Sequence, residues 1–150
     1  MKKIMNTAQS FVYDMCHGLA AAHPELEFVE KYKVVKKKDI NDAKVSLISG
    51  GGSGHEPAHA GFVGKGMLDA AVCGDVFASP SQVQVYNAIK QCATDKGVLL
   101  IVKNYSGDCM NFNNAMSDAQ DDGIKVDAVY VNDDIAVKDS LYTVGRRGVA

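Results

Sequence analysis

The stretch that decides the fold of this chain is Ser49-Gly50-Gly51-Gly52-Ser53-Gly54-His55-Glu56-Pro57. It follows residues 45–48, an apolar run that predicts a short buried strand, and it leads into residues 57–64, a predicted short helix with Pro57 at its first position. The glycines leave backbone N–H groups free to approach a small, oxygen-rich ligand, and His55 ends the loop as a base. The stretch predicts a substrate cradle, although a plain glycine-rich turn also fits it.

The cradle matches neither common nucleotide-binding motif. A phosphate-binding P-loop closes with Lys-Ser or Lys-Thr, and no such pair follows these glycines. The dinucleotide fingerprint needs its third glycine at position 55 or 57, where His55 and Pro57 stand. A serine nucleophile at Ser53 would also need glycine at position 55. We therefore expect no nucleotide to bind at this loop.

Segments typical of strands and helices alternate along the rest of the chain. Residues 97–102 are apolar on both faces, as expected of an interior strand in a parallel sheet. Residues 31–38 mix valines with lysines, which favours an exposed edge strand. The alternation predicts an α/β fold with a central, mostly parallel sheet flanked by helices on both faces. We expect helices at 7–22, 57–64, 81–93 and 109–120, and strands at about 32–36, 45–49, 67–72, 97–102 and 126–131.

Polar residues follow three of these strands at the point where each strand ends. His55 follows the strand at 45–49, Lys103 and Asp108 follow the strand at 97–102, and residues 132–134 follow the last strand. The carboxyl ends of parallel strands share one sheet edge, where ligands collect. A base, a cation and a carboxylate beside glycines suit a small polyol or ketone, whose hydroxyl His55 or Asp108 could deprotonate for attack on phosphorus. Asp108 is equally explained as the N-cap of the helix at 109–120, and Lys103 as a surface charge.

Composition and spacing argue against several other functions. Sixteen basic and eighteen acidic residues give a net charge of −2, which offers no basis for binding nucleic acid or a membrane surface. No apolar segment approaches the length of a membrane helix, and the four scattered cysteines are expected to be reduced thiols in a cytoplasmic protein. His55 and His59 are four residues apart, but Pro57 keeps His55 outside the helix, so no metal site is predicted.

Several motifs resemble the substrate-binding subunit of dihydroxyacetone kinases. One of these motifs is the glycine stretch at 49–57, and the likeness extends over essentially the whole chain. The other motifs that carry it are residues 61–68, 97–108, 133–140 and 145–150. The resemblance implies that residues 1–150 form the N-terminal dihydroxyacetone-binding domain of a longer subunit.

The resemblance also implies roles for individual residues. His55 would be the general base on the hydroxyl that accepts phosphate, and Asp108 would assist proton movement. A second histidine, which forms a covalent hemiaminal with the substrate carbonyl, would belong to a later domain outside this chain. The residues expected to contact dihydroxyacetone are Gly52, Ser53, Gly54, His55, Lys103 and Asp108.

Partners and cofactors are likewise implied by the resemblance. This domain would bind no cofactor itself. ADP or ATP with magnesium would lie on a partner kinase subunit or on another domain, and a phosphotransferase-system donor protein would recharge the nucleotide from phosphoenolpyruvate. A homodimer is implied as well, and the 150 residues alone are expected to be inactive. The alternative is a paralogue that binds dihydroxyacetone as a ligand sensor and acts as a transcriptional coactivator.

Overall fold

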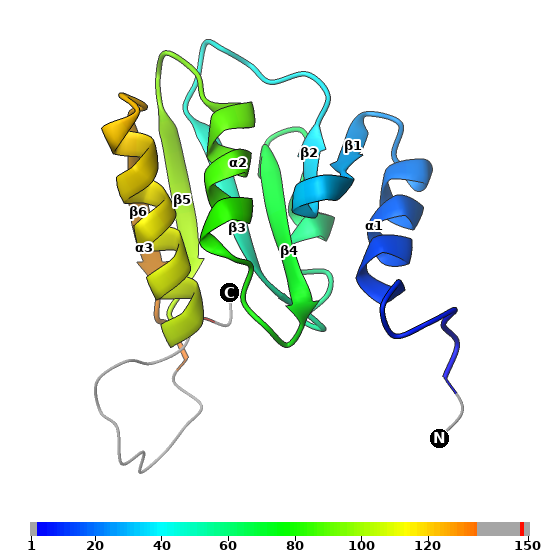
Figure 1. The fold of residues 1–150 in the computed structure, drawn as a ribbon. Helices are drawn as coiled ribbons and strands as arrows, with labels where there is room; N and C mark the ends of the chain where they lie inside the picture. Colours follow the sequence, from blue (N-terminus) through cyan, green and yellow to red (C-terminus); the bar gives the residue numbers. More distant parts are fainter. Residues whose placement is uncertain (1–2, 135–147, 149–150) are drawn as a thin grey trace.

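The computed structural model describes residues 3–134 and residue 148 of the 150-residue chain. The described residues form one six-stranded sheet, three α-helices and two short 3-10 helices (Figure 1). The strands are β1 Leu26–Val29, β2 Val34–Lys37, β3 Ser46–Ser53, β4 Ala70–Val76, β5 Val98–Lys103 and β6 Val126–Val131. The helices are α1 Phe11–Ala22, α2 Gln82–Cys92 and α3 Ser106–Asp121, with 3-10 helices η1 Glu30–Tyr32 and η2 Ala60–Phe62.

The sheet is built around β3. Its strand order is β1-β2-β4-β3-β5-β6. β3 runs parallel to both β4 and β5, and β6 runs parallel to β5. β1 and β2 form an antiparallel pair that joins the sheet through an antiparallel contact of β2 with β4. The predicted α/β fold with a mostly parallel sheet is confirmed.

Helices cover both faces of this sheet, as the sequence predicts. α2 and α3 lie side by side over one face (Figure 1). Their buried residues include Ile89 and Phe112, which pack in one core with Ile48 and Leu100 of the sheet. On the opposite face α1 contributes Val12 and Cys16 to a second core, together with Val35, Ala71 and residues around η2.

Two central elements lie close to their predicted places in the structure. β5 is apolar until Lys103 because it lies inside the sheet, paired with β3 on one side and β6 on the other. α2 begins with a capping box. The hydroxyl of Ser81 accepts a hydrogen bond from the backbone N–H of Gln84 at 3.4 Å, and the Gln84 side chain accepts one from the N–H of Ser81 at 2.8 Å.

The lysine-rich strand is not at the edge of the sheet, so that prediction is wrong. β1, which the sequence did not indicate, pairs with β2 on its outer side. The lysines of β2 are accommodated by carboxylates. Lys36 forms an ion pair with Glu27 of β1, and Lys37 forms one with Asp69. Lysines can stand beside buried valines in β2 because each of these ammonium groups has a carboxylate partner.

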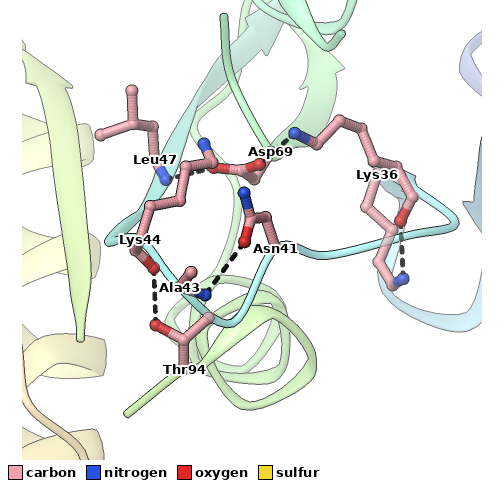
Figure 2. Close-up of polar contacts among 8 residues, drawn as sticks. Lys36, Asn41, Ala43, Lys44, Leu47, Asp69 and Thr94 are labelled. Atoms are coloured by element: carbon pink, nitrogen blue, oxygen red, sulfur yellow. Dashed lines mark hydrogen bonds and ion pairs between the residues drawn. The ribbon is translucent and has the colours of Figure 1, made fainter. Parts of the chain in front are cut away.

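Asp69 fixes the amino ends of β3 and β4. Its side chain is fully buried and accepts hydrogen bonds from the N–H of Leu47 and the Nζ of Lys44, each at 2.9 Å (Figure 2). Burial alone would raise the pKa of Asp69, but hydrogen bonds from Lys37, Lys44 and Leu47 outweigh it and lower the pKa below its ordinary value. The carboxylate therefore stays ionised inside the sheet.

The glycine stretch differs from its prediction. β3 continues to Ser53, so three of the four glycines lie in the central strand and not in a loop. The predicted helix at 57–64 is absent. Residues 54–59 form turns, with hydrogen bonds from the N–H of Ala58 to the carbonyl of His55 and from the N–H of Gly61 to the carbonyl of Pro57, and they lead into the single turn of η2. A segment this short, rich in alanine and glycine, lacks the apolar stripe that would hold a helix against the sheet.

Other element boundaries also move. α1 begins at Phe11 instead of residue 7, β4 covers Ala70–Val76 instead of 67–72, and α3 begins at Ser106 instead of residue 109. Over the part of the chain that the structure describes, no helix has the length and apolar character needed to cross a membrane. The motif at 145–150 lies outside the described residues except for position 148.

Candidate functional site

The connections of the sheet change direction at two neighbouring strands. From β3 the chain passes to β4 on one side, whereas from β5 it passes through α3 to β6 on the other side. In sheets of this kind, ligands bind at the carboxyl ends of the strands where the direction changes. Ser53 ends β3 and Lys103 ends β5. The predicted site residues therefore lie where the topology favours a ligand.

His55 is exposed just beyond the end of β3. Its ring stands edge-on to Phe77, with centroids 5.5 Å apart and an interplanar angle of 89°, and it lies 6.2 Å from the ring of Tyr105. Phe77 follows β4 and Tyr105 follows β5, so the loops after β3, β4 and β5 meet at this imidazole. The exposed ring is accessible to a ligand, as a base must be.

Phe77 is a residue of this site that the sequence did not reveal. It has a φ of 51°, which bulky side chains rarely adopt, and its side chain is 72% exposed. Such a conformation in an exposed aromatic residue is typical of functional loops. No sequence pattern marks it, because its importance comes from its place beside His55.

Lys103 and Asp108 are buried together beside this loop. Lys103 is 7% exposed and its Nζ lies 5.1 Å from the centre of the Tyr105 ring. Burial lowers the pKa of Lys103, and the charge of Asp108 opposes that change. Lys103 is therefore not a surface charge, so that alternative is wrong.

Asp108 is not the N-cap of α3, so that alternative is wrong. Tyr105 occupies the N-cap position, and Asp108 lies in the first turn with 3% of its surface exposed. Burial raises the pKa of Asp108, against the hydrogen bond from Ser79 and the positive charges of Lys103 and His55. Lys103 and His55 thus both lie near enough to Asp108 for their positive charge to lower its pKa. A carboxylate with a raised pKa is suited to taking up and releasing a proton.

Three residues of the predicted cradle, Gly52, Ser53 and Gly54, already make contacts within the chain. Gly52 packs against the backbone of residues 77–78. The hydroxyl of Ser53 donates a hydrogen bond to the carbonyl of Gly74 at 2.8 Å. The N–H of Gly54 donates to both carboxylate oxygens of Glu56, at 3.1 and 2.9 Å. Contacts of these residues with a ligand remain predictions.

His59 is buried beneath the site, 9% exposed. Its Nδ1 lies 2.9 Å from the hydroxyl of Ser49. Burial, followed by the charges of Lys103 and His55, lowers the pKa of His59 to about 4. The sequence suggested only a metal role for this histidine, and its spacing from His55 gave no sign of its burial. In the described part of the chain, no group of three histidine, cysteine or acidic residues is arranged to hold a metal ion.

Comparison with known proteins identifies the family. Residues 17–150 match the Dak1 domain. The dihydroxyacetone-binding subunit of a PTS-dependent dihydroxyacetone kinase from Listeria innocua is 56% identical over 151 residues, which cover 100% of this chain and 46% of that subunit. The crystal structure of the dihydroxyacetone kinase of C. freundii matches with a TM-score of 0.92 and 45% identity, over 99% of this chain and 28% of that one.

A third relative has a different role. The structure of a dihydroxyacetone kinase operon co-activator matches with a TM-score of 0.86 and 40% identity, covering 91% of this chain and 42% of the co-activator. The chain thus spans less than half the length of each of these relatives. Since the Dak1 domain accounts for all but the first sixteen residues, the chain belongs to the Dak1 domain family.

Proposed function

We propose that this chain is the N-terminal, dihydroxyacetone-binding domain of a dihydroxyacetone kinase. The names of its relatives from Listeria innocua and C. freundii support this function. The observation that carries it is that the His55 ring and the Nζ of Lys103 lie 6.2 and 5.1 Å from the centre of the Tyr105 ring, at the carboxyl ends of β3 and β5. Asp108 is buried beside them, and the charges of both act on its pKa. A base, a cation and a carboxylate at one point can bind a hydroxy ketone and deprotonate its hydroxyl group.

In the proposed reaction His55 is the general base. It takes the proton from a terminal hydroxyl of dihydroxyacetone as the oxygen attacks the phosphoryl group, giving dihydroxyacetone phosphate. Asp108 assists by accepting a proton within the site, a task that its raised pKa favours. Lys103 donates hydrogen bonds to a substrate oxygen and offsets the negative charge that develops.

The cradle would contact the substrate mainly through its backbone. The hydroxyl of Ser53 is already bonded to Gly74, so we expect the N–H groups of Gly52, Ser53 and Gly54 to face substrate oxygens. Glu56 accepts the hydrogen bond of the Gly54 N–H. A substrate oxygen would replace this carboxylate when it binds.

The remaining parts of the kinase lie on other domains or chains in this proposal. ADP or ATP with magnesium is held by a partner subunit or another domain, and a phosphotransferase-system protein supplies the phosphoryl group. The proposal also includes a homodimer, and a hemiaminal histidine in a later domain. This domain contributes no nucleotide site.

Replacement of the base tests the function directly. His55→Ala in the full-length protein is expected to lower kcat for dihydroxyacetone phosphorylation by about 10²- to 10⁴-fold, the usual loss for a general base. His23→Ala, at an exposed histidine after α1, is the matched control and should leave kcat unchanged. Near-normal turnover by His55→Ala would remove His55 from the mechanism.

A ligand sensor is the second candidate, because a co-activator is 40% identical over 91% of this chain and has the same fold. Such a protein would bind dihydroxyacetone without phosphorylating it. Calorimetric titration of dihydroxyacetone into the full-length protein, followed by a turnover assay in the complete kinase system, separates the two functions. Binding with turnover supports the kinase, whereas binding without turnover supports the sensor.

A further inference from the structure

The hydrogen atom on the His59 ring can be assigned from its neighbours. The hydroxyl of Ser49 donates its hydrogen to the carbonyl of Ile101, at 2.6 Å. A serine hydroxyl has one hydrogen, so towards His59 the same oxygen can only accept. The Nδ1 of His59, 2.9 Å away, therefore carries the ring hydrogen. The ring is neutral at physiological pH, which leaves its Nε2 as a hydrogen-bond acceptor.

Two buried side chains, each with an acceptor atom that has no partner, lie near the same glycine. Among the described residues, the Nε2 of His59 and the Oδ1 of Asp108 are buried without a hydrogen-bond partner. A Cβ built on Gly51 would stand 2.9 Å from the Nε2 of His59 and 3.7 Å from the Oδ2 of Asp108. Both side chains therefore face Gly51, His59 through its unpartnered Nε2 and Asp108 through the second oxygen of the carboxylate whose Oδ1 has no partner.

The chemistry of these two groups defines what fits between them. The Nε2 of His59 accepts only, and the carboxylate of Asp108 accepts only, so the group must carry two donor hydrogens. Water has two donor hydrogens and is the usual partner of buried polar atoms that the protein itself leaves unsatisfied. A single substrate hydroxyl has one hydrogen and could satisfy only one of them.

We propose that His59 is a positioning residue of the candidate site, linked to Asp108 through a buried water molecule beside Gly51. The water donates one hydrogen to the Nε2 of His59 and the other to the carboxylate of Asp108. When Asp108 takes up a proton, its O–H donates to the same water, which continues to donate to His59. Both protonation states of Asp108 thus keep complete hydrogen bonds. The inference rests on the proposed function in so far as Asp108 acts on the substrate.

The neighbouring charges set the direction of the expected pH effect. Lys103 at the end of β5 and His55 in the loop after β3 are the charged groups that act on both His59 and Asp108. The water bonds to both forms of Asp108, but a hydrogen bond to a charged carboxylate is stronger than one between neutral groups, so the water favours the ionised form. Removing the acceptor that orients this water should therefore move the limb of the pH profile that belongs to Asp108 towards higher pH.

Two variants separate positioning from packing. Asparagine at position 59 retains an amide N–H near the place of Nδ1, and so the contact with Ser49, but offers nothing at the place of Nε2. Glutamine reaches the place of Nε2 with an amide that can accept a hydrogen bond. We expect His59→Asn in the full-length protein to lower kcat roughly 10- to 100-fold, the scale of groups that orient a reacting residue, with little change in KM. We expect His59→Gln to recover at least part of this loss.

The outcomes distinguish this inference from the proposed function. If His59→Asn keeps the wild-type kcat and pH profile and only lowers stability, His59 is a packing residue and the inference is overturned. If the wild-type protein does not phosphorylate dihydroxyacetone, the kinase proposal fails, and a high-resolution crystal structure of the full-length protein still decides the inference. A water within hydrogen-bond distance of both the Nε2 of His59 and the carboxylate of Asp108 supports it, and any other arrangement of these two groups refutes it.

Discussion

Glycine at position 52 is required by the backbone that passes beside it. A Cβ there would lie 2.7 Å from the backbone nitrogen of Ala78 and 3.0 Å from the carbonyl carbon of Phe77. Because backbone atoms cannot rotate away as a side chain can, even one methyl group would push the loop after β4 outward. That loop carries Phe77, whose ring packs against His55. Because Gly52 has no side chain, the loop after β4 can pack closely against β3, and this loop places Phe77 against His55.

This close approach predicts different effects at two glycines. Gly52→Ala should destabilise the protein by about 1–3 kcal/mol, the usual cost of overpacking, and should weaken dihydroxyacetone binding. Gly64→Ala is the control, because no atom lies within 4 Å of its Cβ position, and it should be neutral or slightly stabilising. Urea denaturation of both variants measures the difference. Equal stability of the two would show that the contact at Ala78 imposes no constraint.

At the level of elements, the sequence predicts what local pattern determines. α2 is marked by its capping box at Ser81, and β5 and β6 by their apolar runs, so these elements are found close to their predicted places. β1 has four residues and is defined by its pairing with β2, which no local pattern reveals. The glycine part of β3 has no side chains to show a strand period. Lys103 and Asp108 could be predicted from the sequence because they follow the end of a strand. His59 and Phe77 could not, because they reach the site through contacts that form only in the folded protein.

Asp69, at the amino ends of β3 and β4, is expected to contribute strongly to the free energy of unfolding. Asp69→Asn should lower the free energy of unfolding by about 3 kcal/mol, because it leaves the ammonium groups of Lys37 and Lys44 without their buried partner. Asp75→Asn provides the control, since Asp75 is 73% exposed in its ion pair with Lys33 and should contribute less than about 1 kcal/mol. Comparable losses in the two variants, measured by chemical denaturation, would contradict a structural role for Asp69.

Over the whole molecule, the two ends of the sheet differ in how their buried polar groups are satisfied. At the amino end Asp69 is surrounded by donors and its pKa is lowered. At the carboxyl end burial shifts the pKa of His59, Lys103 and Asp108 in each case towards the neutral form. Burying these groups costs stability, which proteins accept at sites of function. The stable end fixes the strands whose opposite ends carry the chemistry.

This division predicts how stability depends on pH. A histidine in the unfolded chain takes up a proton below about pH 6.5, whereas folded His59 stays neutral down to about pH 4. Between these values the unfolded state binds more protons, so stability falls as the pH falls, by up to about 3 kcal/mol at pH 4. His59→Asn cannot titrate and should lose this part of the dependence. Urea denaturation at pH 7 and pH 4.5 gives the free energy of unfolding of both proteins. An equal loss of this free energy in the two proteins between pH 7 and pH 4.5 would show that His59 titrates normally.

The central claim is that His55, Lys103 and Asp108 together bind a three-carbon hydroxy ketone at the carboxyl ends of β3 and β5. The most direct measurement is a crystal structure of the full-length protein with dihydroxyacetone. We expect its oxygen atoms within hydrogen-bond distance of Lys103 and Asp108, and one hydroxyl within reach of the His55 ring. Dihydroxyacetone bound away from these three side chains, or no binding at all, would contradict the claim.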